Sequence, residues 1–262
     1  MARKNVSILI AVCAFVFLAQ SARCDAPEVK PNVARLLDKA AAAIAEPELF
    51  DRLSSLQFKG RSWSTEAGSG EVFDSEPAKT EMLMVFPGEV PVELFMHSLH
   101  QPSTGGSFVR TLAGEFSFAK NIGHLPADLH QDFVRYASTK LLTILRYRKS
   151  PGFSAEWIGS EKIDGRDVDL VKASLFGHES TLEVERGSGR VLAVRFHSSE
   201  IQEGVEDQVV RRAYTDLRSV EGFTIPFLQE VTVGDEPYSR WQLDEVIVDG
   251  DYDTGLFDLR DE

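Results

Sequence analysis

Cysteines, basic residues and long hydrophobic runs are all scarce in this chain of 262 residues. Two cysteines exclude a disulfide scaffold and a cysteine-based zinc module, because both need several thiols. Only 28 basic residues stand against 41 acidic ones, and a chain of formal charge −13 is repelled by the phosphates of nucleic acids. We therefore expect no nucleic-acid partner. With 43% hydrophobic and 26% charged residues, the composition is that of a globular protein.

The motifs of common catalytic and cofactor sites are missing as well. The chain has no G-x-S-x-G turn for a nucleophilic serine, no glycine-rich phosphate loop and no H-E-x-x-H pair for zinc. Residues 249–253 (DGDYD) resemble the start of a calcium loop, but Arg260 stands where a bidentate glutamate is needed. We predict no catalytic residue, no cofactor and no metal site. A hydrolase with an unrecognised carboxylate or histidine site is the enzymatic alternative.

The N-terminus has the order of a secretory signal peptide. Two basic residues precede an apolar run at 6–18, and small residues follow it up to Ala22. The run is about 13 residues long, short of the ~20 that a membrane-spanning helix needs. We predict removal of residues 1–24 and a periplasmic location, with no membrane span after cleavage. An uncleaved anchor is one alternative; acylation of Cys24 is disfavoured, because Arg23 occupies a position that needs a small residue.

Helical spacing predicts two amphipathic segments in residues 25–262, which we expect to form a single domain. Asn32 is placed to cap a helix that ends before Pro47, and Pro47 begins one more turn. The second segment is a helix over 125–149, with Phe133 and Leu141 on its apolar stripe.

Alternation with a period of two dominates the rest of the chain. It predicts strands over 167–175, 179–185, 190–197, 208–218, 227–233 and 239–248. Short strand-like runs also occur between 56 and 118, although the role of residues 77–118 stays open. Strands with one apolar face form an antiparallel sheet that is covered on one side, so we predict an α+β fold.

Five short and mainly structural motifs accompany this order of elements: 58–60 (FKG) with a tryptophan following, 163–170 (IDGRDVDL), the hairpin 182–194 with Glu185 and a Ser188-Gly189 turn, 214–226 (YTDLRSVEGFTIP) and 253–257 (DTGLF). Together they resemble the LolA/LolB-like superfamily of periplasmic lipoprotein-carrier proteins. The resemblance implies a curved antiparallel sheet, a half-open β-barrel, that two or more helices cover on one face. It also implies an apolar cleft that can hold acyl chains.

The predicted ligand-binding residues are large apolar side chains on the inner face of this sheet and its covering helix. They are Trp63, Phe133, Leu141, Leu182, Val184, Leu192, Val194, Phe196, Trp241 and Leu243. The same residue types would also form a filled core, and the sequence does not separate the two.

The resemblance implies an exported, non-enzymatic protein that binds or carries an amphiphilic ligand, with the acyl chains of a lipid or lipoprotein as partners. The alternative is an interaction or assembly module of the envelope, which would have the same fold, protein partners and no ligand.

Overall fold

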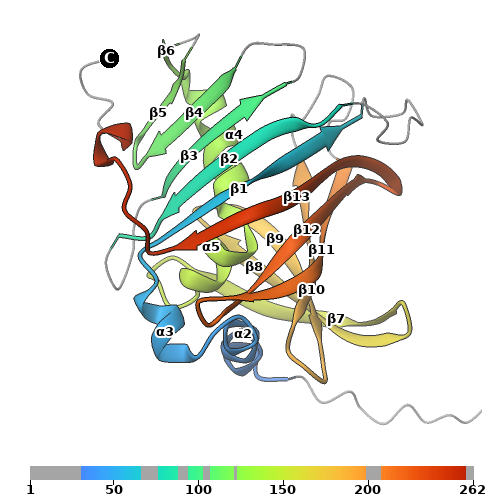
Figure 1. Cartoon of the computed structure of the whole chain (residues 1–262). Helices are drawn as coiled ribbons and strands as arrows, with labels where there is room; N and C mark the ends of the chain where they lie inside the picture. Colours follow the sequence, from blue (N-terminus) through green and yellow to red (C-terminus); the bar gives the residue numbers. More distant parts are fainter. Residues whose placement is uncertain are drawn as a thin grey trace, which may run out of the picture. The chain divides into compact units, whose positions relative to one another are not determined.

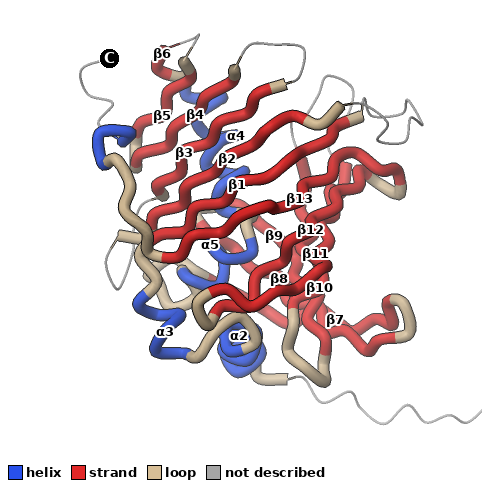
Figure 2. Tube along the Cα trace, viewed as in Figure 1, coloured by secondary structure: helices blue, strands red, loops and turns tan. Residues whose placement is uncertain are grey.

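The computed structural model describes residues 31–65, 76–87, 94–102, 107–120, 123–198 and 208–257. The predicted signal segment and Arg260 lie outside these ranges. From Asn32 onward the described residues form one compact unit, a curved and open antiparallel sheet with helices on its concave face (Figure 1 and Figure 2). This is the predicted α+β half-barrel. Within the described part of the chain, no helix is both long and apolar enough to span a membrane.

The described residues contain four α-helices, one 3-10 helix and thirteen strands. The helices are α2 (Val33–Ala42), α3 (Pro47–Arg52), α4 (Ala127–Ser138), α5 (Leu141–Arg146) and η1 (Thr254–Phe257). The strands are β1 (Ser55–Ser64), β2 (Ala78–Val85), β3 (Phe95–Gln101), β4 (Phe108–Ala113), β5 (Phe116–Ala119), β6 (Gly123–His124), β7 (Ser154–Ile163), β8 (Arg166–Leu175), β9 (His178–Glu185), β10 (Val191–Ser198), β11 (Gln208–Val220), β12 (Phe223–Val233) and β13 (Glu236–Val248).

The strand order determines where the covering helices run. It is β6-β5-β4-β3-β2-β1-β13-β12-β11-β10-β9-β8-β7, so β1 and β13 pair in the middle and β6 and β7 are the two edges. Because β7 follows β6 in sequence, the connection between them has to cross from one edge of the sheet to the other. α4 and α5 make this crossing along the concave face (Figure 1).

Two of the sequence motifs correspond to backbone that requires glycine. Gly60 lies at a register shift between β1 and β13, and a Cβ atom there would be 2.2 Å from the carbonyl oxygen of Gln242. Glu221 and Gly222 both have positive φ (49° and 86°), as the two-residue turn between β11 and β12 demands. The glycines of these two motifs therefore have structural roles.

The N-terminal helices begin as predicted. The side chain of Asn32 accepts a hydrogen bond from the Arg35 N–H (3.0 Å) and caps α2, and α3 begins at Pro47. The peptide N–H of Thr224 donates to the carbonyl of Ile44 (2.6 Å), which joins the end of the α2 region to β12.

The single helix predicted over 125–149 is wrong, because Thr139 and Lys140 divide it into α4 and α5. The hydroxyls of Ser138 and Thr139 donate to carbonyls three residues earlier (2.9 and 3.2 Å), which competes with helical hydrogen bonding. Lys140 then takes an extended backbone conformation (ψ 134°). The Arg212 guanidinium donates to the Thr139 carbonyl (3.1 Å) and so holds the break against β11.

This two-helix cover is anchored at both ends. In α4, the His130 ring is hydrogen-bonded to Ser117 of β5 (3.1 Å). Just beyond α5, Arg148 forms ion pairs with Asp38 of α2 (3.0 Å) and Asp51 of α3 (3.2 Å). The break at Thr139 and Lys140 therefore lies between two fixed ends.

The convex face carries a buried ion-pair cluster. Glu183 of β9 is 0% exposed and pairs with Arg195 of the neighbouring strand β10 (2.6 Å) and with Arg211 of β11, one strand further along the sheet (2.7 Å). Burial alone would raise the pKa of Glu183, but the hydrogen bonds from these arginines bring it below its usual range. Register places Glu183 opposite Ala193 and Leu170, so the arginine side chains cover a patch of small and apolar residues.

Glu183→Gln is expected to lower the free energy of unfolding by roughly 2–3 kcal/mol at pH 7, since it removes charged hydrogen bonds in a buried position. Because the folded-state pKa of Glu183 is lowered, its stabilising effect is present above the unfolded value of about 4.3 and is lost as the pH falls through the folded value. Urea unfolding from pH 7 to pH 3 should therefore show the variant and the wild type converging. Glu245→Gln, which removes an exposed pair with Lys59, is the control and should change stability much less. Equal losses in both variants would contradict the assignment.

Phe133→Ala tests whether α4 packs as core. Phe133 is 4% exposed and belongs to the main hydrophobic cluster, so truncation should cost about 3–5 kcal/mol in urea unfolding. Leu129→Ala on the same helix removes a side chain that is 39% exposed and should cost far less. A loss below about 1 kcal/mol for Phe133→Ala would mean that α4 does not pack tightly on the sheet.

Candidate ligand-binding cavity

A small cavity lies where the helix break meets the middle of the sheet. Its volume is about 30 Å³, room for one or two water molecules, and it is partly open to solvent. The walls come from β1, β2, β11, β12, β13 and the start of α5. The lining residues are Phe58, Met82, Met84, Lys140, Leu141, Leu142, Tyr214, Ile225, Pro226, Gln229 and Trp241.

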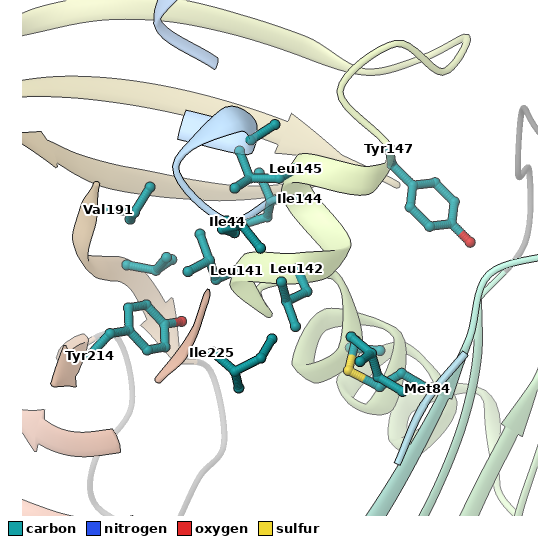
Figure 3. Close-up of a cluster of buried hydrophobic side chains, with 14 of the residues drawn as sticks. Ile44, Met84, Leu141, Leu142, Ile144, Leu145, Tyr147, Val191, Tyr214 and Ile225 are labelled. Carbon is teal, nitrogen blue, oxygen red and sulfur yellow. The ribbon is translucent and has the colours of Figure 1, made fainter. Parts of the chain in front are cut away.

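Most of the cavity wall is apolar. Phe58 and Trp241 meet edge to face with their ring centroids 5.9 Å apart. Figure 3 shows Leu142, Met84 and Ile225 from three different elements around the same space. Met82 and Met84 bring unbranched, adaptable side chains that can repack around a guest. The wall thus suits an alkyl chain, although the cavity has to widen to admit one, since sites for small molecules usually measure about 300–1,000 Å³.

Lys140 is the unexpected residue in this wall. It is 8% exposed, and its ammonium lies 3.8 Å from the centroid of the Tyr136 ring and 5.9 Å from that of Trp241. Burial lowers the pKa of Lys140 well below its usual value of 10.5, and repulsion from Arg212 lowers it further. Among the described residues, no carboxylate forms an ion pair with it.

Arg212 is a second buried cation beside the first. It is 4% exposed, donates to the Thr139 carbonyl and lies over the Phe196 ring (5.1 Å to the centroid) and near Tyr136 (5.9 Å). No carboxylate in the described ranges pairs with Arg212 either. An acidic chain has therefore placed two positive groups together in its interior without counter-charges.

Two further polar groups in the cavity wall lack partners. The indole N–H of Trp241 and the hydroxyl of Tyr214 are buried and make no hydrogen bond of normal geometry with any described residue. The Tyr214 hydroxyl points towards Leu141 in Figure 3, and Arg212 is also near it. Burial raises the pKa of Tyr214, so it is a neutral donor at physiological pH.

A polar strip continues from the cavity along the inner face of β1, β2 and β3. Ser62 is opposite Trp241 in the register, and its hydroxyl contacts that of Thr80 (2.7 Å). The His100 ring contacts both hydroxyls (3.4 and 3.3 Å), and burial lowers the pKa of His100. These three side chains do not line the cavity, but they continue from Trp241 along the inner face of the sheet.

Two of the ten predicted site residues, Leu141 and Trp241, line the cavity. Six others lie in the surrounding core without lining it: Phe133, Leu182, Val184, Val194, Phe196 and Leu243.

The remaining two predicted site residues lie elsewhere. Strand alternation puts Trp63 on the face of Lys59 and Arg61, where the Arg61 guanidinium is 5.9 Å from its ring centroid. Leu192 falls at a bulge between Val191 and Ala193 and is half-buried. The predicted alternation, which places Leu192 on the same face as Val194 and Phe196, is therefore broken at this bulge.

Most of the side chains that line the cavity are not among the predicted ligand-binding residues. The predicted continuous helix over 125–149 gave no reason for Lys140 to turn inward, and only the adjacent Ser138-Thr139 pair signals the break there. Met82 and Met84 are followed by the apolar residues Leu83 and Val85, so no alternation with polar residues marks them as inner-facing, and they belong to the segment 77–118, whose role stays open in the sequence. Tyr214 was treated as part of a structural motif.

The aspartate run near the C-terminus has an internal role. The Asp249 carboxylate accepts hydrogen bonds from the Ser54 N–H and hydroxyl (both 2.7 Å) and from the Ser55 N–H (2.9 Å). These bonds lower the pKa of Asp249 against the opposing effect of burial. The described residues contain no group of three or more His, Cys, Asp or Glu side chains that could hold a metal ion.

Comparison with known proteins identifies the architecture. No family model matches the sequence, and no curated protein matches it either. Three solved structures resemble 87% of this chain: a DUF1329 family protein from Desulfovibrio piger (TM-score 0.54, 11% identity, 98% of its chain), a LolA superfamily protein from Nitrosomonas europaea (0.53, 13%, 97%) and a domain from Vibrio parahaemolyticus that is named for outer-membrane lipoprotein sorting (0.54, 10%, 97%). At such low identities the likeness concerns the architecture alone: the chain has a LolA-like fold.

Proposed function

We propose that this chain is an exported, non-enzymatic envelope protein that binds the alkyl chain of an amphiphile in the cavity under α5. The observation that carries the proposal is a mainly apolar, partly open cavity at the centre of a sheet whose cover is broken at that point. The likeness to solved structures named for LolA and lipoprotein sorting supports it. The proposal includes cleavage of residues 1–24, which the N-terminal pattern predicts.

The cavity requires rearrangement before it can hold an alkyl chain. The cover is fixed at its outer ends by the His130 and Arg148 contacts, whereas its middle carries the extended residue Lys140 and the short helix α5. Displacement of α5 and repacking of Met82 and Met84 would widen the space without breaking the sheet. On binding, apolar contacts among these side chains would be replaced by apolar contacts with the alkyl chain.

Filling the cavity should abolish binding. Met84→Phe adds a ring at the wall, and we expect it to weaken binding of a fluorescent fatty-acid probe by at least about 10-fold, with a stability change of about 1–3 kcal/mol. Met96→Phe is the matched control, because Met96 is the register partner of Met84 on β3, is buried, and does not line the cavity. Fluorescence titration and thermal unfolding of both variants and the wild type make the comparison.

Absence of saturable probe binding by the wild type would contradict the proposal and favour the interaction module, for which the same fold needs no ligand. Equal weakening in Met84→Phe and Met96→Phe would place the binding site elsewhere. Native mass spectrometry of protein purified from a bacterial envelope, with lipid bound to the wild type and lost from Met84→Phe, would support the carrier.

A further inference from the structure

We propose that the cavity selects a single-chain amphiphile with an anionic head group, which Lys140, Tyr214 and Trp241 bind by charge and hydrogen bonds. This inference rests on the proposed function and adds the chemical class of the ligand. The shared chemistry is a carboxylate or phosphate attached to an alkyl chain.

The first argument is that Lys140 stays inside although a lysine can reach solvent. Its long, flexible side chain normally keeps the ammonium in water, and burying an ammonium without an anion is costly. Tyr136 is 37% exposed, so the ammonium stacked on its ring is close to the surface and yet turned inward. The cation–π contact offsets part of the cost, but no residue in the described part of the chain accepts a hydrogen bond from the ammonium.

The second argument is the inventory of polar groups. The ammonium of Lys140 and the indole N–H of Trp241 can only donate, and the Tyr214 hydroxyl, which lies near Arg212 and the Leu141 backbone, is a further donor without a hydrogen bond of normal geometry. No Asp or Glu lines the cavity. Gln229, the register partner of Tyr214 and Trp241, is the one other polar side chain of the lining, and its single amide oxygen cannot satisfy all three donors. A ligand that satisfies these groups has to bring acceptors, and an anion brings the strongest ones.

The third argument is the sign of the surrounding charge. Arg212, which is buried beside Tyr136 as Lys140 is, repels Lys140 and adds to the larger effect of burial in lowering the pKa of this lysine. A bound anion relieves this repulsion, whereas a cationic head group would increase it. The interior of this acidic chain therefore favours an anionic head group over a cationic one.

The fourth argument concerns the tail. Apart from Gln229, the rest of the lining is apolar and includes Phe58, Met82, Met84, Leu142 and Ile225, so a chain attached to a head group at Lys140 meets mainly apolar surface. A free phosphate or acetate would leave that surface unused. A cavity of about 30 Å³ is also more readily widened for one chain than for two.

The test compares ligands of equal chain length by calorimetry: laurate, lauryl phosphate, neutral monolaurin and dodecyltrimethylammonium, with inorganic phosphate and acetate as tail-free anions. We expect the wild type to bind at least one of the two anionic amphiphiles about 10-fold or more tightly than monolaurin, and to bind the cation and the free anions far more weakly. Comparing the affinities for laurate and lauryl phosphate then shows which anionic head group the cavity prefers.

Lys140→Met should reduce the affinity for the anionic amphiphile about 10- to 100-fold and leave that for monolaurin unchanged or higher. Lys140→Arg should retain the preference for anions. Because Lys140→Met replaces an uncompensated buried charge with an apolar side chain, its Tm should equal or exceed that of the wild type. Lys79→Met, at an exposed lysine of β2, is the matched control and should change neither affinity.

Tyr214→Phe provides a second variant, since it removes a hydroxyl without a hydrogen-bond partner and should weaken anion binding without loss of stability. Equal binding of laurate and monolaurin by the wild type, unchanged in Lys140→Met, would overturn the inference and leave the proposed function standing. Binding of inorganic phosphate as tight as that of lauryl phosphate would also overturn it. Failure to bind any of the amphiphiles would instead overturn the proposed function.

Discussion

The pairing of β1 with β13 is the constraint on which the rest of the structure depends. It places the two ends of the folded unit in the middle of the sheet and leaves β6 and β7 as distant edges. The chain between those edges must then cross the concave face, and α4 and α5 form that crossing. An open sheet has an apolar face that other elements have to cover. Here the connection between β6 and β7 contributes α4 and α5 to that cover.

The position of the break in this cover determines where a ligand can enter. Arg212 takes the Thr139 carbonyl, the hydroxyls of Ser138 and Thr139 end α4, and Lys140 turns into the cavity. The same guanidinium that fixes the backbone also raises the positive charge behind the lysine. The break in the helical backbone and the pair of buried positive charges therefore coincide between α4 and α5. A ligand that binds there can change both the backbone conformation and the electrostatics.

The fold was more predictable than the site, for physical reasons. Alternation of apolar and polar residues reports which face of a strand is buried, so the antiparallel sheet, the Asn32 cap and the Pro47 helix start follow directly from the residues. The break at Lys140 does not, because it depends on Arg212, which is distant in sequence. The bulge at Leu192 likewise shifts the alternation in a way that no local pattern indicates.

The residues that line the cavity were harder to predict than the fold, because a cavity wall and a filled core use the same kinds of side chain. Leu182 and Val194 are buried as expected and yet do not line the cavity, whereas Leu141 does. Which of them faces open space depends on the path of α5 across the sheet. The polar members of the site, Lys140 and Tyr214, were invisible to an analysis that sought only large apolar residues.

An NMR titration of the Lys140 side chain tests the central claim most directly, with its signal identified by its loss in Lys140→Met. In the free protein, Lys140 should titrate well below the usual value of 10.5, because burial and Arg212 disfavour the charged form. Saturation with the tighter-binding anionic amphiphile should raise that pKa, because an adjacent anion favours the ammonium. An ordinary pKa in the free protein, or the same pKa with and without bound amphiphile, would contradict the account.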